Sequence, residues 1–179
     1  LMDYAEKFNA RWDKVDLNSE LVHDLPALAS ALKSDTRILF LCNPNNPTGT
    51  FIPGDQFKNF CQEMSKKTTV FVDEAYIEFL EPDEQRTMVE LVKEGHNVIV
   101  SRTFSKVHGL AGLRIAYAIA PPDVIKKLAR FQMGAVINQA ALAAAKASLE
   151  DHEFAIYTRK KNNEALAYFS NYLSSKGWI

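Results

Sequence analysis

The chain has 179 residues, of which 47% are hydrophobic and 24% are charged, and its formal net charge at pH 7 is −1. This composition is typical of a globular protein and gives no electrostatic reason to expect nucleic acid or an anionic membrane as a partner. We expect a cytoplasmic protein, because no apolar run approaches about 20 residues, Leu1–Glu6 contain no signal-peptide core, and two cysteines are too few for a disulfide framework.

Three short apolar segments are each followed directly by a polar motif. In chain order these are 38–42 before Asn43–Gly49 (NPNNPTG), 69–72 before Asp73–Tyr76 (DEAY), and 98–100 before Ser101–Lys106 (SRTFSK). The branched and aromatic residues of the apolar segments are typical of buried strands. Because ligands of a parallel α/β sheet lie beyond the carboxyl ends of the strands, we expect the three motifs to converge on one edge of a sheet.

Helical spacing appears between and after these strands. The expected helices are 54–66, one that begins at Asp123 after two prolines, the alanine-rich segment 140–149, and a last helix that ends at Gly177. Strands separated by helices predict an α/β fold, a three-layer α/β/α sandwich with a mostly parallel sheet. Cys42 at a strand end and Cys61 on an apolar helix face are predicted to be small core residues.

One segment combines groups that suit a single small molecule. Ser101–Lys106 places a lysine beside two hydroxyl groups, and Arg114 follows eight residues later. A lysine amine can form an imine with an aldehyde, while hydroxyl groups and a guanidinium suit a phosphate. An aldehyde that carries a phosphate describes pyridoxal 5'-phosphate (PLP), which is the cofactor that this segment predicts.

Taken together, the motifs resemble those of the fold-type I PLP-dependent aminotransferases of class I/II. The forms NPNNPTG, VDEAYIEF and TFSK with GLAGLR look most like those of histidinol-phosphate aminotransferases, and the resemblance covers essentially the whole chain. It implies the large domain of a PLP-dependent transferase, found as a homodimer. It also implies amino-group transfer between an amino compound, with histidinol phosphate as the best guess, and 2-oxoglutarate in histidine biosynthesis.

The resemblance assigns a role to each motif residue. Lys106 would be the Schiff-base lysine and would move a proton as general base and acid, and Asp73 would keep the pyridine nitrogen protonated. The implied catalytic residues are Lys106, Asp73 and Tyr76, and the implied cofactor-binding residues are Asn46, Asp73, Tyr76, Thr103, Ser105, Lys106 and Arg114. Asn46 and Tyr76 would donate to the phenolate oxygen, and Thr103, Ser105 and Arg114 would contact the phosphate. No metal site is expected, because the four histidines lack metal-ligand spacing.

Each of these residue types also has an ordinary structural use. Asp73 could cap a helix, Asn46 could serve a turn, and the hydroxyl groups of Thr103 and Ser105 could bond locally. Arg114 lies in an apolar segment, where a charge usually has a dedicated partner.

The two charged neighbours of the motif residues are expected to lie outside the site. Glu74 should point away from it, because neighbouring residues of an extended backbone face opposite sides. Arg102 is compatible with a surface cation.

In the resembled family, a long helix leads from the large domain into a small domain that binds the substrate carboxylate. We therefore expect 1–145 to be the central part of the large PLP-binding domain and 146–179 to be a helix that leads toward the small domain. We also expect a fragment without the family's phosphate loop and ring-stacking aromatic residue, with weak PLP binding and poor turnover. The alternatives are another class I/II aminotransferase, an amino-acid phosphate decarboxylase of the same fold, and a non-catalytic truncated domain.

Overall fold

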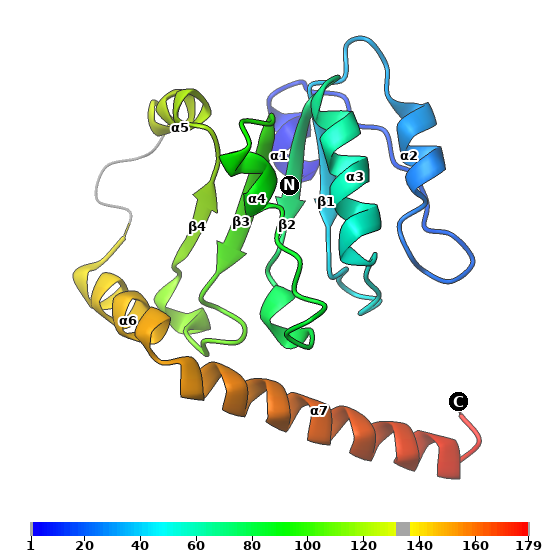
Figure 1. The fold of residues 1–179 in the computed structure, drawn as a ribbon, viewed down its shortest axis with the longest axis vertical. Helices are drawn as coiled ribbons and strands as arrows, with labels where there is room; N and C mark the ends of the chain where they lie inside the picture. Colours follow the sequence, from blue (N-terminus) through cyan, green and yellow to red (C-terminus); the bar gives the residue numbers. More distant parts are fainter. Residues whose placement is uncertain (1, 132–136, 179) are drawn as a thin grey trace.

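The computed structural model describes residues 2–131 and 137–178, with a four-stranded sheet at its centre (Figure 1). In order across the sheet, the strands are β1 (Ile38–Cys42), β2 (Thr69–Asp73), β3 (Val98–Thr103) and β4 (Ala116–Ile119). β1, β2 and β3 are parallel, and β4 runs antiparallel to β3. The three expected strands are confirmed, and the apolar segment after Arg114 adds an antiparallel edge strand.

Seven helices and two 3₁₀ turns are found among the described residues. The helices are α1 (Met2–Lys7), α2 (Leu25–Ala31), α3 (Gly54–Ser65), α4 (Val89–Lys93), α5 (Pro122–Ala129), α6 (Gln139–Glu150) and α7 (His152–Ser175), and the turns are η1 (Ile77–Phe79) and η2 (Ala111–Leu113). The four expected helices are confirmed as α3, α5, α6 and α7. Asp151 separates the last two, since its side chain accepts a hydrogen bond from the Phe154 N–H at 3.0 Å and so begins α7. The predicted division at 145/146 falls within α6 and stays a prediction.

The main core lies between α2, α3, α4 and one face of the sheet. Alternate strand residues supply it, because successive side chains of a strand point to opposite faces. The buried residues of this cluster include Leu41, Val70, Val72, Val98 and Val100 from the strands and Phe57, Cys61, Met64 and Leu91 from α3 and α4. In Figure 1, α4 lies in front of the strands and α1 behind them. The α/β fold with a mostly parallel sheet is confirmed.

The opposite face of the sheet is more open. Ile38 and Phe40 of β1 are 57% and 42% exposed there, and Phe40 stacks on Phe71 of β2 with ring centroids 5.4 Å apart. Asp73 and Ser101 share this face, because they lie two residues beyond Phe71 and Ile99 on paired strands. The polar motif residues therefore continue an apolar surface that the main core does not cover.

The two cysteines differ in burial, and we expect them to differ in reactivity. Cys61 is buried in the core, and burial raises the pKa of its thiol. Cys42 is half-buried, its thiol donates to the Pro44 carbonyl at 3.2 Å, and burial raises its pKa as well. Because only the thiolate reacts, iodoacetamide at pH 8.5 should modify Cys42 slowly and Cys61 only after unfolding.

Mass spectrometry of the alkylated peptides checks this order of reactivity. The variant Cys42→Ser leaves Cys61 as the single thiol of the chain and serves as the control. Rapid labelling of that variant without denaturant would contradict the burial of Cys61.

Candidate functional site

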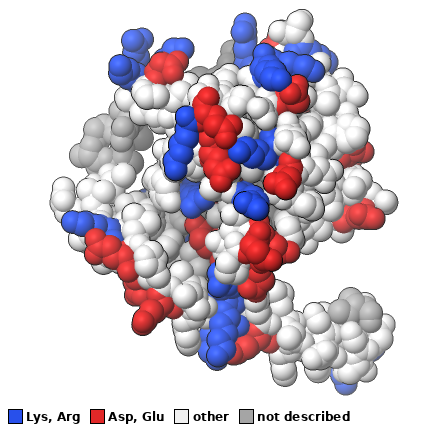
Figure 2. Space-filling model, in the orientation of Figure 1, with Lys and Arg blue, Asp and Glu red and all other residues white. Residues whose placement is uncertain are grey.

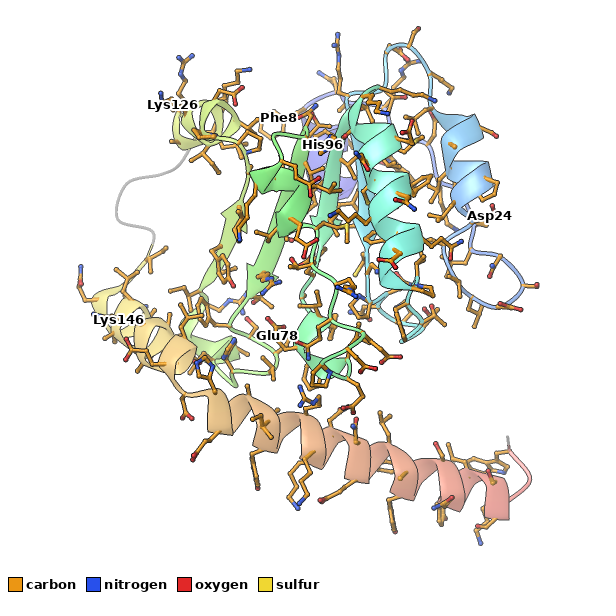
Figure 3. The ribbon with its side chains drawn as sticks, in the orientation of Figure 1. Phe8, Asp24, Glu78, His96, Lys126 and Lys146 are labelled. Carbon is orange, nitrogen blue, oxygen red and sulfur yellow. The ribbon has the colours of Figure 1, made fainter. Side chains whose placement is uncertain are left out.

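The three polar motifs meet at the carboxyl ends of the parallel strands, as the sequence predicts. Cys42, Asp73 and Ser101 occupy matching positions on β1, β2 and β3. The Asn43 N–H continues the ladder beyond β1 by donating to the Asp73 carbonyl at 3.1 Å. Figure 3 places Glu78, which follows β2, at this end of the sheet, and His96, which precedes β3, at the other.

Asp73 is half-buried and is held through one of its two carboxylate oxygens. Oδ1 accepts hydrogen bonds from the Ser101 hydroxyl at 3.0 Å and the Ala75 N–H at 3.1 Å. Oδ2 makes no hydrogen bond to any residue within 2–131 or 137–178. The bond to Ala75 is a local turn contact and not the start of an α-helix. Asp73 therefore has an oriented carboxylate with one acceptor oxygen available.

Asn46 and Tyr76 come together from different loops. The Asn46 amide Nδ2 donates to the Tyr76 hydroxyl at 3.0 Å. Behind them, Asn43 closes the loop of the first motif, because its Oδ1 accepts from the Ile52 N–H at 2.8 Å and its Nδ2 donates to the Ile52 carbonyl at 3.4 Å. Gly49 provides the turn with a φ of 71°. Asn46 therefore both lies in a turn and contacts Tyr76.

Lys106 lies beside the same tyrosine. Its Nζ is 5.0 Å from the centroid of the Tyr76 ring, within the range of a cation–π contact. The side chain is exposed, and no carboxylate of the described residues forms an ion pair with it. The amine is therefore accessible and not neutralised by an acidic partner.

The predicted phosphate ligands make local hydrogen bonds, and among the described residues no hydrogen bond joins their side chains to the cluster of Lys106, Tyr76 and Asn46. Thr103 accepts a hydrogen bond on Oγ1 from the Ser105 N–H at 3.0 Å, which is the local bonding expected of a loop hydroxyl. Arg114 is exposed, has a left-handed φ of 53°, and donates from Nη1 to the Ala111 carbonyl at 2.8 Å. Arg114 ends the exposed turn η2 before the apolar segment enters the sheet, and its role at a phosphate stays a prediction.

Two contacts of the strand ends are missing from the sequence prediction. Ser101 binds Asp73, and Arg102 is held against Glu74 with Nη2 2.8 Å from Oε2. The reading of Arg102 as a surface cation is wrong, because its side chain is only 21% exposed. Glu74 points away from Asp73, as expected. In the sequence, strand alternation predicts only which face of the sheet each of these side chains occupies. The partners follow only once the register of β2 and β3 is known.

His108 belongs to the packing around the site. Its Nδ1 lies 2.7 Å from the Ser148 hydroxyl of α6, and its ring is 5.2 Å from that of Phe104. Burial and the nearby Arg102 lower the pKa of His108, so the ring is neutral at pH 7. His108 therefore joins the loop after Lys106 to α6.

Figure 2 shows acidic and basic side chains interspersed on one face, and Lys58 pairs at 3.0 Å with both Glu90 and Glu94. Across residues 2–131 and 137–178, no helix combines the length and apolar character that crossing a membrane requires.

Comparison with known proteins adds the family context. A model of the family described as aminotransferase class I and II matches residues 5–179. Histidinol-phosphate aminotransferase 1 of Cupriavidus pinatubonensis is 48% identical over 132 residues, which are 74% of this chain and 35% of that protein. The histidinol-phosphate aminotransferase of Sinorhizobium meliloti, solved in complex with pyridoxal-5'-phosphate, superposes with a TM-score of 0.89 at 26% identity over 98% of this chain and 48% of that one.

A solved decarboxylase shares the same fold. The L-threonine-O-3-phosphate decarboxylase of Porphyromonas gingivalis superposes with a TM-score of 0.79 at 24% identity, over 97% of this chain and 50% of that one. The alignments cover 35–43% of the length of the curated relatives. The same fold is therefore shared by an aminotransferase and a decarboxylase.

Proposed function

The chain belongs to the class I and II aminotransferases, and from this premise we propose that the protein transfers an amino group between an amino compound and a 2-oxoacid with PLP as cofactor. The observation that carries the proposal is the position of the Lys106 amine beside the Asn46–Tyr76 pair. These groups lie at the strand-end edge that also holds Asp73, whose Oδ2 is available.

The chemistry of these side chains fits the groups of PLP. Lys106 offers a primary amine to the aldehyde, and Asp73 offers an acceptor oxygen to the protonated ring nitrogen. The Asn46 amide and the Tyr76 hydroxyl are donors suited to the phenolate oxygen. Thr103, Ser105 and Arg114 supply two hydroxyl groups and a guanidinium for the phosphate.

The protein's own groups would then divide the work of proton transfer and orientation. PLP, when bound, supplies an electron sink for a carbanion next to the amine nitrogen. Lys106 would take a proton from the substrate α-carbon and return it at the C4' position, as general base and acid. Asp73, held by Ser101 and Ala75, would keep the ring nitrogen protonated. Tyr76 lies near enough to Lys106 to orient the amine.

We propose histidinol phosphate as the amino donor and 2-oxoglutarate as the acceptor. The support is the likeness to histidinol-phosphate aminotransferases that are 39–48% identical over the aligned segments. The homodimer and the cytoplasmic location stay predictions. Assaying the protein with histidinol phosphate or a phosphorylated amino acid, each with 2-oxoglutarate, distinguishes amino transfer from release of carbon dioxide.

A labelling experiment tests the cofactor and the site together. PLP is added, the visible spectrum is recorded, and the mixture is reduced with borohydride and mapped by peptide mass spectrometry. We expect a new absorption band and a reduced PLP label on Lys106. Label spread over many surface lysines, or no band, would argue for a non-catalytic domain.

Arg114 offers a test that separates binding from stability. The variant Arg114→Gly should keep the free energy of unfolding within about 1 kcal/mol, because relief of the left-handed φ offsets the greater chain entropy of glycine. Loss of the guanidinium should weaken PLP binding by at least about tenfold, the scale of a hydrogen bond to a charged group.

Absorbance titration with PLP and thermal unfolding without it are the two measurements. Arg130→Gly, at the exposed end of α5, is the matched control and should bind PLP as the wild type does. Unchanged PLP affinity in Arg114→Gly would remove Arg114 from the phosphate site.

A further inference from the structure

The buried carboxylate of Glu74 lies at the end of β2, on the face of the sheet opposite Asp73. It is 1% exposed. Oε2 accepts hydrogen bonds from Arg102 Nε and Nη2 at 3.0 and 2.8 Å. Oε1 accepts from the Met88 N–H at 2.6 Å, and the Thr87 hydroxyl lies 3.1 and 2.8 Å from the two oxygens. Both oxygens are therefore fully hydrogen-bonded, as burial requires.

Arg102 connects this carboxylate to the loop that carries Tyr76. Its Nη1 lies 3.7 Å from Oε1 of Glu78, a half-buried residue of η1. Glu74 and Glu78 flank Tyr76 in the sequence, two residues away on either side. One guanidinium on β3 thus holds the Tyr76 loop at both of its ends.

The same two strand ends are also joined on the other face. The Ser101 hydroxyl donates to Asp73, and the Glu74 N–H donates to the Ser101 carbonyl at 2.9 Å. Arg102 follows Ser101 directly and precedes Lys106 by four residues. Side-chain contacts on both faces of the sheet therefore fix the segment that carries Asp73 and Tyr76 to the segment that carries Lys106.

We infer that Glu74 and Arg102 are positioning residues, which hold Asp73 and Tyr76 in place against Lys106 and thereby set the affinity of the site for PLP. A stabilising role alone accounts poorly for the pair, because apolar residues often replace buried ion pairs without loss of stability. Positioning accounts for its place directly beneath the site and for the second contact with Glu78. This inference rests on the proposed function.

A double-mutant cycle on the PLP-binding protein tests it. Glu74→Gln keeps the shape of the side chain and its acceptor for Met88, and Arg102→Met keeps the stem without the donors. The dissociation constant for PLP is measured by absorbance titration at a temperature at which every variant is folded. Each single variant should bind PLP at least about tenfold more weakly, while the double variant should be no weaker than either, because contacting residues are coupled.

The ion pair of Lys58 and Glu90 serves as the control, because it lies on the same side of the sheet but away from the site. Glu90→Gln removes one ion pair of Lys58 between α3 and α4 and should leave PLP affinity unchanged. The pH midpoint of the PLP absorption band should shift in Glu74→Gln and stay unchanged in Glu90→Gln. A role confined to fold stability would not move this midpoint.

Hydrogen exchange without PLP separates this inference from the proposed function. Amides 74–78 should exchange faster in Glu74→Gln, while those of β1 stay protected. If the wild type is labelled on Lys106 and Glu74→Gln binds PLP with the same affinity and midpoint, the positioning role is overturned and the proposed function stands. If the wild type is not labelled on Lys106, the proposed function fails, and unchanged exchange at 74–78 would overturn the positioning of the loop as well.

Discussion

Replacing Lys106 by alanine should abolish the borohydride-fixed PLP label and reduce amino transfer by at least about a thousandfold. General acid–base catalysis alone contributes about 10²- to 10⁴-fold, and the amine that would hold the cofactor is lost with it. Within the described ranges 2–131 and 137–178, the exposed side chain has one ring contact, with Tyr76, so the free energy of unfolding should fall by no more than about 1 kcal/mol. Peptide mapping and a steady-state assay measure the two effects.

Lys126 provides the matched control for this experiment. It is an exposed lysine of α5 and lies at the opposite end of the sheet from the candidate site (Figure 3). Lys126→Ala should retain both the label and the activity. Retention of a stoichiometric label in Lys106→Ala would assign the covalent role to another lysine.

Replacing Asp73 by asparagine should lower turnover by about a hundredfold with little effect on the fold. A neighbouring carboxylate raises the pKa of a cationic group by about 1–3 units, so its loss would leave the ring nitrogen largely unprotonated. The asparagine Oδ1 can still accept from Ser101 and Ala75, which keeps the local structure. The free energy of unfolding should therefore change by no more than about 1 kcal/mol.

The decisive comparison is between turnover and stability in the same variant. Asp123→Asn, in the first turn of α5, removes an acidic charge at an exposed position and should alter neither quantity. A wild-type turnover number for Asp73→Asn would mean that Oδ2 has no role at the ring nitrogen. A large loss of stability would instead show that the carboxylate is a structural turn residue.

Much of the fold follows from local patterns in the chain. The apolar spacing of Phe57, Cys61 and Met64 predicts α3, because these residues share one helical face. The convergence of the three motifs follows from parallel strands, whose carboxyl ends lie at one edge. The Asn46–Tyr76 and Tyr76–Lys106 contacts agree with that expectation.

The remaining features depend on how strands pair across the sheet, which local sequence patterns do not reveal. Ser101 reaches Asp73, and Arg102 reaches Glu74, only because β2 and β3 pair in one register. The antiparallel β4 is set by the turn η2 and not by its composition, which suits either strand direction. Arg114 is exposed because that turn places it outside the apolar segment that surrounds it in the sequence.

Adjacent carboxylates at the end of β2 have consequences for how this chain tolerates insertions and deletions. Asp73 lies on the open face and Glu74 on the buried face, and the side-chain repeat of a strand is two residues. Loss or gain of one residue within β2 would turn each acid to the opposite face of the sheet, so that neither would keep both its place and its present partners. Length changes of the chain should therefore be tolerated in the loops before β2 and rejected within it, even where every acidic residue is retained.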